Sequence, residues 1–211
     1  MEKIKGNELK IFVIISIIML FIAAFICDSP KDILLGMRDI IFSRDVLMTD
    51  YFVLAGSGAA FFNAAFVLTI CTVLVIFQRI PFTGPTLAAL FIDVGYGLWG
   101  KNVINIIPIL LGVYLYARVH KMRFGRHIYT ALYGTCLAPF VTEIVHLLPF
   151  SVGVNVIFAI LTGLLIGFLL PPLSAHTASM HMGYNLFNIG FSAGILAFIL
   201  FSAVFKGLLY T

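Results

Sequence analysis

The fold of this chain is decided by a stretch that occurs twice, GKNVINI at residues 100–106 and GYNLFNI at residues 183–189. Both copies share the pattern G-x-N-x-x-N-I, and both open an apolar run after a segment interrupted by glycine or proline. Three expected crossings separate them, so the two copies should enter the membrane from opposite sides, as in inverted-repeat transporters whose broken helices surround a site near the midplane.

Four asparagines of this repeat are therefore candidates for lining a substrate path: Asn102, Asn105, Asn185 and Asn188. A helix start offers free N–H groups, and asparagine adds both a donor and an acceptor, which suits a small polar solute. The alternative is that the asparagines cap helices or hydrogen-bond between helices, a common role of polar side chains in membranes.

The composition places the chain in a lipid bilayer. Of its 211 residues, 62% are hydrophobic and 10% are charged, and the mean hydropathy is +1.11. Soluble domains carry about a quarter of their residues as charges, so soluble and disordered classes are excluded. We expect one all-α polytopic membrane domain over residues 1–211, with a first repeat at 1–120 and a second at 127–211.

The net charge of +4 indicates topology. Residues 118–126 contain four basic side chains and no acid, so the rest of the chain sums to zero. By the positive-inside rule this loop, and with it the N-terminus, should be cytoplasmic in a bacterial inner membrane. The net charge therefore does not indicate nucleic-acid binding. The three cysteines are far apart in the sequence and form no disulfide framework.

The first half of the chain predicts two spans and a surface helix. Residues 11–27 are uncharged and should form an uncleaved first span. Residues 30–45 combine mixed charge with apolar residues at helical spacing, which predicts an amphipathic helix with Pro30 near its start. Residues 51–78 would form a helix of about 42 Å against a core of ~30 Å, so they should tilt or break near Gly56 and Gly58.

The remaining segments bring the expected number of spans to about seven. Residues 81–100 carry glycines and prolines typical of a broken or re-entrant helix. Spans are then expected at 103–117, 128–148, 151–170 and 185–205. Pro171 and Pro172 should end the 151–170 span, and a polar connection with His176 and His181 should follow.

Two resemblances extend this interpretation. GLWGKN at 97–102 resembles a signature of bacterial urea transporters, and LLGMRDIIF at 34–42 resembles their amphipathic stretch, although Lys101 replaces an aromatic residue of the signature. The stretch from 84 to 194 resembles an uncharacterised bacterial family of polytopic membrane proteins of unknown function. That family's greater length implies that this chain is half of a longer architecture and assembles at least as a dimer, and the urea-transporter resemblance implies a trimer.

Ionisable residues inside apolar segments are further candidates. Glu143 and His146 are three residues apart on one face of an expected span, where Glu143 could act as a proton acceptor or cation contact. Asp93 is either a pore carboxylate or the partner of Lys101 in an ion pair. His176 and His181 lack the spacing of a helical metal site, and His181 is a candidate proton-sensitive group.

These features predict a channel or transporter for a small polar solute, assembled as a homo-oligomer through the small-xxx-small faces Gly163/Gly167 and Gly190/Gly194. No catalytic, metal-binding or cofactor-binding motif is recognisable. Two alternatives stay open. One is an intramembrane enzyme that uses Glu143 with His146, His176 and His181, and the other is a structural subunit of a larger membrane assembly.

Overall fold

The structure is a computed structural model that describes residues 2–45, 49–184 and 187–209, and these residues form helices and connections without a strand. The elements in chain order are α1 (Glu2–Cys27), α2 (Pro30–Phe42), α3 (Tyr51–Ala55), α4 (Ser57–Phe77), α5 (Gly84–Gly97), α6 (Ile106–Val119), η1 (Phe124–His127), α7 (Ile128–Gly134), η2 (Thr135–Leu137), α8 (Ala138–Leu147), α9 (Val152–His181) and α10 (Asn188–Leu209).

Within the described residues, four helical segments are long and apolar enough to cross a membrane, which confirms an all-helical membrane protein. They are Gly6–Cys27 of α1, α4, the run Phe124–Leu147 formed by η1 to α8, and α9. The helix α6 and the segment Asn188–Ser202 of α10 are apolar but shorter. At 14 residues, α5 is about 21 Å long and falls short of the ~30 Å core.

The long uncharged run at residues 51–78 breaks where the sequence predicts. Gly56 separates α3 from α4 and adopts a φ of 87°, a conformation that costs glycine little. The Asp28 carboxylate accepts a 2.6 Å hydrogen bond from the backbone N–H of Gly58, at the first turn of α4. A Cβ on Gly58 would lie 2.6 Å from the Cβ of Asp28, so the small residue permits this contact between α1 and α4.

The amphipathic helix is also confirmed, as α2. Ser29 accepts a hydrogen bond from the backbone of Asp32 at its N-terminus, with Pro30 in the first turn. Ile33, Met37 and Ile40 are buried on one face. The helix ends at Phe42, three residues before the expected end.

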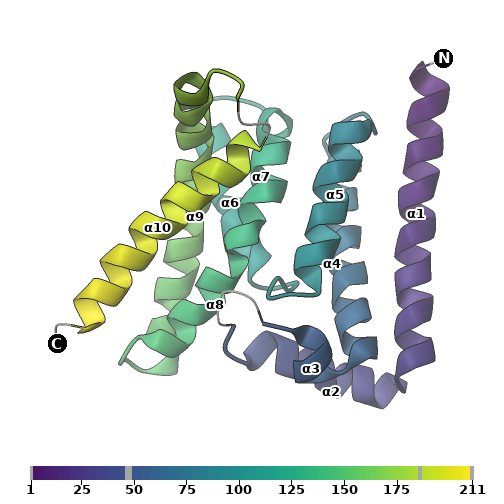
Figure 1. Cartoon of the computed structure of the whole chain (residues 1–211), viewed down its shortest axis with the longest axis horizontal. Coiled ribbons are helices and arrows are strands. Elements are labelled where there is room, and N and C mark those ends of the chain that lie inside the picture. Colours follow the sequence, from purple (N-terminus) through teal and green to yellow (C-terminus); the bar gives the residue numbers. More distant parts are fainter. Residues whose placement is uncertain (1, 46–48, 185–186, 210–211) are drawn as a thin grey trace.

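Figure 1 shows the arrangement of the helices. The helices α1, α4 and α5 stand together, α9 and α10 stand at the other side, and α2 and α3 lie across the lower end. The α4–α5 and α6–η1 connections lie at the upper end with the N-terminus. Packing between α6 and α9 depends on glycine, because a Cβ on Gly167 would lie 2.1 Å from the carbonyl oxygen of Ile109.

One expected helix end was wrong. The helix α9 continues through Pro171 and Pro172 to His181, so the expected polar connection is helical. Each proline removes an N–H donor, but apolar helices tolerate this where hydroxyl side chains and neighbours bond the freed carbonyls. The carbonyls freed in α9 are those of Gly167 and Phe168, four residues before the two prolines, and the hydroxyl of Ser174 donates to the carbonyl of Pro171 in the following turn.

Candidate functional site

The first copy of the repeat forms a compact loop between α5 and α6. Gly100 has a φ of 102°, and Asn105 precedes the first residue of α6. The side-chain oxygen of Asn102 accepts hydrogen bonds from the backbone of Ile104 at 3.0 Å and of Asn105 at 2.9 Å. The side-chain oxygen of Asn105 in turn accepts from the backbone N–H of Asn102 at 2.9 Å. The side chain of each asparagine therefore accepts a hydrogen bond from the backbone N–H of the other.

The amide nitrogens of the same asparagines bind other elements. Asn102 donates to the carbonyl of Ile40 at the end of α2 at 3.3 Å. Asn105 donates to the carbonyl of Gly100 at 2.9 Å and to the hydroxyl of Thr142 on α8 at 3.0 Å. Both side chains are buried. Their hydrogen-bonding groups are thus occupied within the protein, as the capping alternative describes.

A buried carboxylate lies next to this loop, in the connection between α2 and α3. Asp45 is fully buried, and its Oδ2 accepts from the hydroxyl of Tyr51 at 3.3 Å and from Asn105 at 3.5 Å. Its Oδ1 accepts no hydrogen bond from the described residues. Burial raises the pKa of Asp45 to about 7 by disfavouring the charged form.

Glu143 is held by an arginine of the same connection. Arg44 donates from Nε to both carboxylate oxygens, at 3.1 and 2.9 Å, and from Nη2 to Oε1 at 2.5 Å. The carboxylate is buried, whereas half of the arginine side chain is exposed. This bidentate pair joins α8 to the α2–α3 connection. The negative charge of Glu143 is thus paired with Arg44 in this structure, so the carboxylate is not a free proton acceptor.

Asp93 and Lys101 form a buried ion pair, which confirms one of the two readings of Asp93. Neither side chain has exposed surface. The ammonium group of Lys101 also lies 5.5 Å from the centre of the Tyr96 ring. Asn63 of α4 fixes the backbone around the pair, since its amide donates to the carbonyls of Gly97 and Lys101 at 2.7 and 2.8 Å.

Asp93 also lies beside a cavity. Oδ2 accepts no hydrogen bond from the described residues, and Asp93 is one of the residues around a cavity of about 450 Å³. This Asp93 cavity lies between α5, the α7–η2 region and the start of α10, and its wall comprises Ile92, Asp93, Tyr96, Tyr133, Cys136, Phe187, Asn188, Ile189 and Gly190.

The second copy of the repeat reaches this cavity through Asn188. Its side-chain oxygen accepts from the hydroxyl of Thr177 at 2.8 Å and lies 2.7 Å from Nε2 of His181. The backbone N–H of Gly183 donates to Nδ1 of His181, so the imidazole accepts at Nδ1 and donates at Nε2. Gly183 has a φ of 89°, similar to Gly100 in the first copy.

A family model described as a protein of unknown function (DUF1576) matches residues 29–206. The chain belongs to the DUF1576 family. The match confirms the expected family of unknown function and includes every residue of the loop, the ion pair and the cavity described above. No curated protein and no solved structure matches the chain.

The remaining predicted residues of this DUF1576 protein are dispersed. His146 on α8 and His176 on α9 are exposed, and Asn185 lies outside the described residues. Asn155, near the start of α9, bonds the carbonyls of Val145 and Leu148 at the end of α8. His181 follows Asn155 by 26 residues, about 39 Å of helix. Glu143 and His146 of the enzyme alternative therefore lie at one end of α9, and His176 and His181 lie toward the other.

Sequence reasoning missed several polar residues of this DUF1576 site. Asp45 is one charge in a stretch of mixed charge, and Asn63 and Thr142 gave no signal because one polar residue in an apolar run is common. With helical spacing, Asn63 falls on the same face of α4 as the small residues Ala59, Ala60 and Ala64, and that face is buried. This pattern is the signal that could have identified Asn63. Among the described residues no group of three or more metal-ligating side chains occurs.

Proposed function

We propose that this protein forms a passage for a small polar solute across the membrane, with the Asp93 cavity as its central site. One observation carries the proposal: Asp93, which is fully buried and whose Oδ2 accepts no hydrogen bond from the described residues, is one of the residues around a cavity of about 450 Å³. Ionisable groups inside membrane segments are costly, and they mark solute or ion pathways more often than they serve packing. Tyr96, Tyr133 and Asn188 add further polar groups to an otherwise apolar wall.

In this proposal the chain crosses the bilayer seven times. The four long segments are joined by α5, α6 and α10, which complete an alternating course through the bundle (Figure 1). The N-terminus is placed in the cytoplasm together with the basic 118–126 loop, since both lie at the upper end and positive loops stay inside.

The inverted repeat supports a shared site. Gly100 and Gly183 both adopt positive φ, and a helix begins five residues after Gly183 and six after Gly100. The helices that follow, α6 and α10, run in opposite directions (Figure 1). The first copy contributes Lys101, which compensates Asp93, and the second contributes Asn188. Two broken-helix ends around one polar site are typical of secondary transporters.

A homo-oligomer is also proposed, with α10 at its interface. Gly163 and Gly167 pack inside the chain against Pro108 and Ile109, whereas a Cβ on Gly194 would meet no described atom within 4 Å. The small face of α10 is therefore free to contact a second copy.

Cys136 provides the experiment, because it is one of the residues around the Asp93 cavity and is partly exposed. We would reconstitute a Cys27→Ser variant, which lacks the exposed thiol, in liposomes and measure flux of small polar solutes by stopped-flow light scattering. Treatment with 2-aminoethyl methanethiosulfonate should reduce this flux, and an additional Cys136→Ala change should abolish the effect of the reagent. Flux no greater than in protein-free liposomes, or flux unchanged after complete labelling of Cys136, would contradict the proposal.

A further inference from the structure

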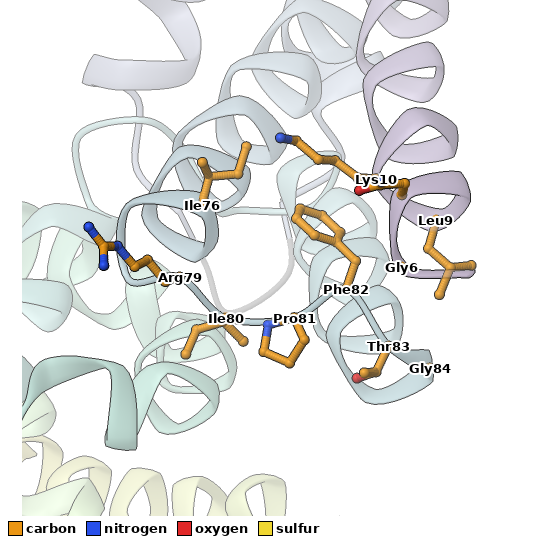
Figure 2. A pocket seen from close by; sticks show the side chains of 11 residues that line it. Gly6, Leu9, Lys10, Ile76, Arg79, Ile80, Pro81, Phe82, Thr83 and Gly84 are labelled. Atoms are coloured by element: carbon orange, nitrogen blue, oxygen red, sulfur yellow. The ribbon is translucent and has the colours of Figure 1, made fainter. Parts of the chain in front are cut away.

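A second cavity lies at the upper end of the molecule, between the start of α1 and the α4–α5 connection. It has a volume of about 710 Å³ and is separate from the Asp93 cavity. The residues around this basic cleft are Gly6, Asn7, Leu9, Lys10, Ile76, Arg79, Ile80, Pro81, Phe82, Thr83 and Gly84. Figure 2 shows Lys10 and Arg79 at opposite edges of the cleft, with Ile76 and Phe82 between them.

The basic cleft combines two positive charges with an apolar wall. Lys10 and Arg79 are its charged residues, and none of the described residues around it is acidic. Neither cation takes part in the ion pairs found among the described residues, which are Arg44–Glu143 and Asp93–Lys101. Leu9, Ile76 and Phe82 supply apolar surface beside these charges. The cleft thus suits a ligand that is anionic at one end and apolar at the other.

Backbone donors reinforce the positive potential. The helix α5 begins at Gly84, and its N-cap residue Thr83 makes no side-chain capping bond. The first N–H groups of a helix point toward its N-terminus and, with the helix dipole, favour a negative charge there. Gly84 leaves this end open, since an added Cβ would meet no atom within 4 Å.

Arg79 holds its position at a conformational cost. It ends α4 with a φ of 56°, in the left-handed region that glycine or asparagine adopts more easily. Lys121 ends α6 in the same way, with a φ of 55°, and lies at the same end of the molecule but outside the basic cleft. These two residues therefore form a matched pair, alike in charge and backbone and different in whether they border the cleft.

We propose that the basic cleft binds an anionic phospholipid, with the phosphate near Lys10, Arg79 and the start of α5, and the first acyl carbons against Ile76 and Phe82. A phospholipid fits better than a soluble anion, because α1 leaves most of its apolar surface uncovered by protein and so borders the bilayer beside the cleft. The basic residues at this end also match the anionic cytoplasmic leaflet. This site is independent of the proposed passage.

Binding would be measured by native mass spectrometry of the full chain in a neutral detergent, titrated with dioleoylphosphatidylglycerol or dioleoylphosphatidylcholine. We expect one phosphatidylglycerol to bind more tightly than phosphatidylcholine. A basic residue near an anionic lipid contributes about fivefold in affinity, so Lys10→Gln with Arg79→Gly should weaken binding about 25-fold. Lys121→Gly is the control, because it removes one charge and relieves the same backbone strain, and it should leave the affinity unchanged.

Each outcome decides for or against the site. Equal weakening by Arg79→Gly and Lys121→Gly would show a general effect of surface charge and would overturn the proposal. Equal affinity for the two lipids would do the same. Free glycerol phosphate forms a third arm: if it competes at the concentration of the lipid, the apolar wall contributes nothing and the ligand is a soluble phosphate instead. Arg79 is exposed and glycine relieves its backbone strain, so the Arg79→Gly variant should fold, and thermal unfolding of each variant checks this.

Discussion

The buried pair of Asp93 and Lys101 allows a quantitative test of how charge is held inside this protein. Neither side chain has exposed surface, so each ion has lost its hydration and is compensated mainly by the other. Removing one partner of a buried pair costs about 3–5 kcal/mol, because an uncompensated charge stays behind. Replacing both partners by neutral groups is often close to neutral, since neither desolvation cost is then incurred.

The test is a double-mutant cycle of Asp93→Asn, Lys101→Met and the double variant. Each single variant should lose about 3–5 kcal/mol of unfolding free energy, a large share of the ~5–15 kcal/mol of a typical protein. The double variant should recover most of that loss. Unfolding would be followed by SDS titration in mixed micelles at a fixed detergent-to-lipid ratio. Lys31→Met removes an exposed lysine of α2 and should change the free energy by less than about 0.5 kcal/mol.

Two results would refute this reasoning. If the losses of the single variants add in the double variant, the two charges do not compensate each other. If Lys101→Met unfolds at the same SDS fraction as Lys31→Met, the lysine is not buried as an ion. The cycle reports on the pair itself, since Asn63 binds backbone carbonyls and is unchanged in every variant.

Three further predictions concern packing and the first repeat. Asn102→Leu should lower the unfolding free energy by about 2 kcal/mol, at ~0.6 kcal/mol for each of three lost bonds, as measured by SDS titration. Gly167→Ala should prevent folding or markedly lower thermal stability because its Cβ meets backbone, whereas Gly194→Ala should be tolerated, as thermal unfolding would show. Because the folded state holds the proton of Asp45 to about pH 7 and the unfolded state to about pH 4, stability should fall as pH rises from about 4 to about 7. Asp45→Asn should remove this dependence in unfolding measured across that range.

Local features of the fold could be predicted from the sequence. The break at Gly56 followed from a helix longer than the bilayer core, and the amphipathic α2 followed from its mixed charge and apolar spacing. The pairing of Asp93 with Lys101 was also within reach, because eight residues separate them and a buried charge requires a partner. Each of these predictions rests on a physical limit that acts within one segment.

Contacts between distant segments could not be predicted in this way. Arg44 and Glu143 are 99 positions apart, and no feature of either segment indicates that the two side chains pair. The helix α9 continues past Pro171 and Pro172 although neither proline has an N–H donor, so a rule based on proline alone gives the wrong helix end. Neither outcome follows from local propensity alone.

The two copies of the repeat share a backbone conformation but differ in what their asparagine side chains contact. In both, a glycine with positive φ precedes a helix start, which explains why glycine and the pattern recur. The asparagines of the first copy bond to backbone and to Thr142, next to the buried Asp45, so this copy closes the bundle near α2 and α8. Asn188 of the second copy instead borders the Asp93 cavity. The second copy therefore contributes directly to the wall of that cavity, whereas the first copy reaches it through Lys101, which pairs with Asp93.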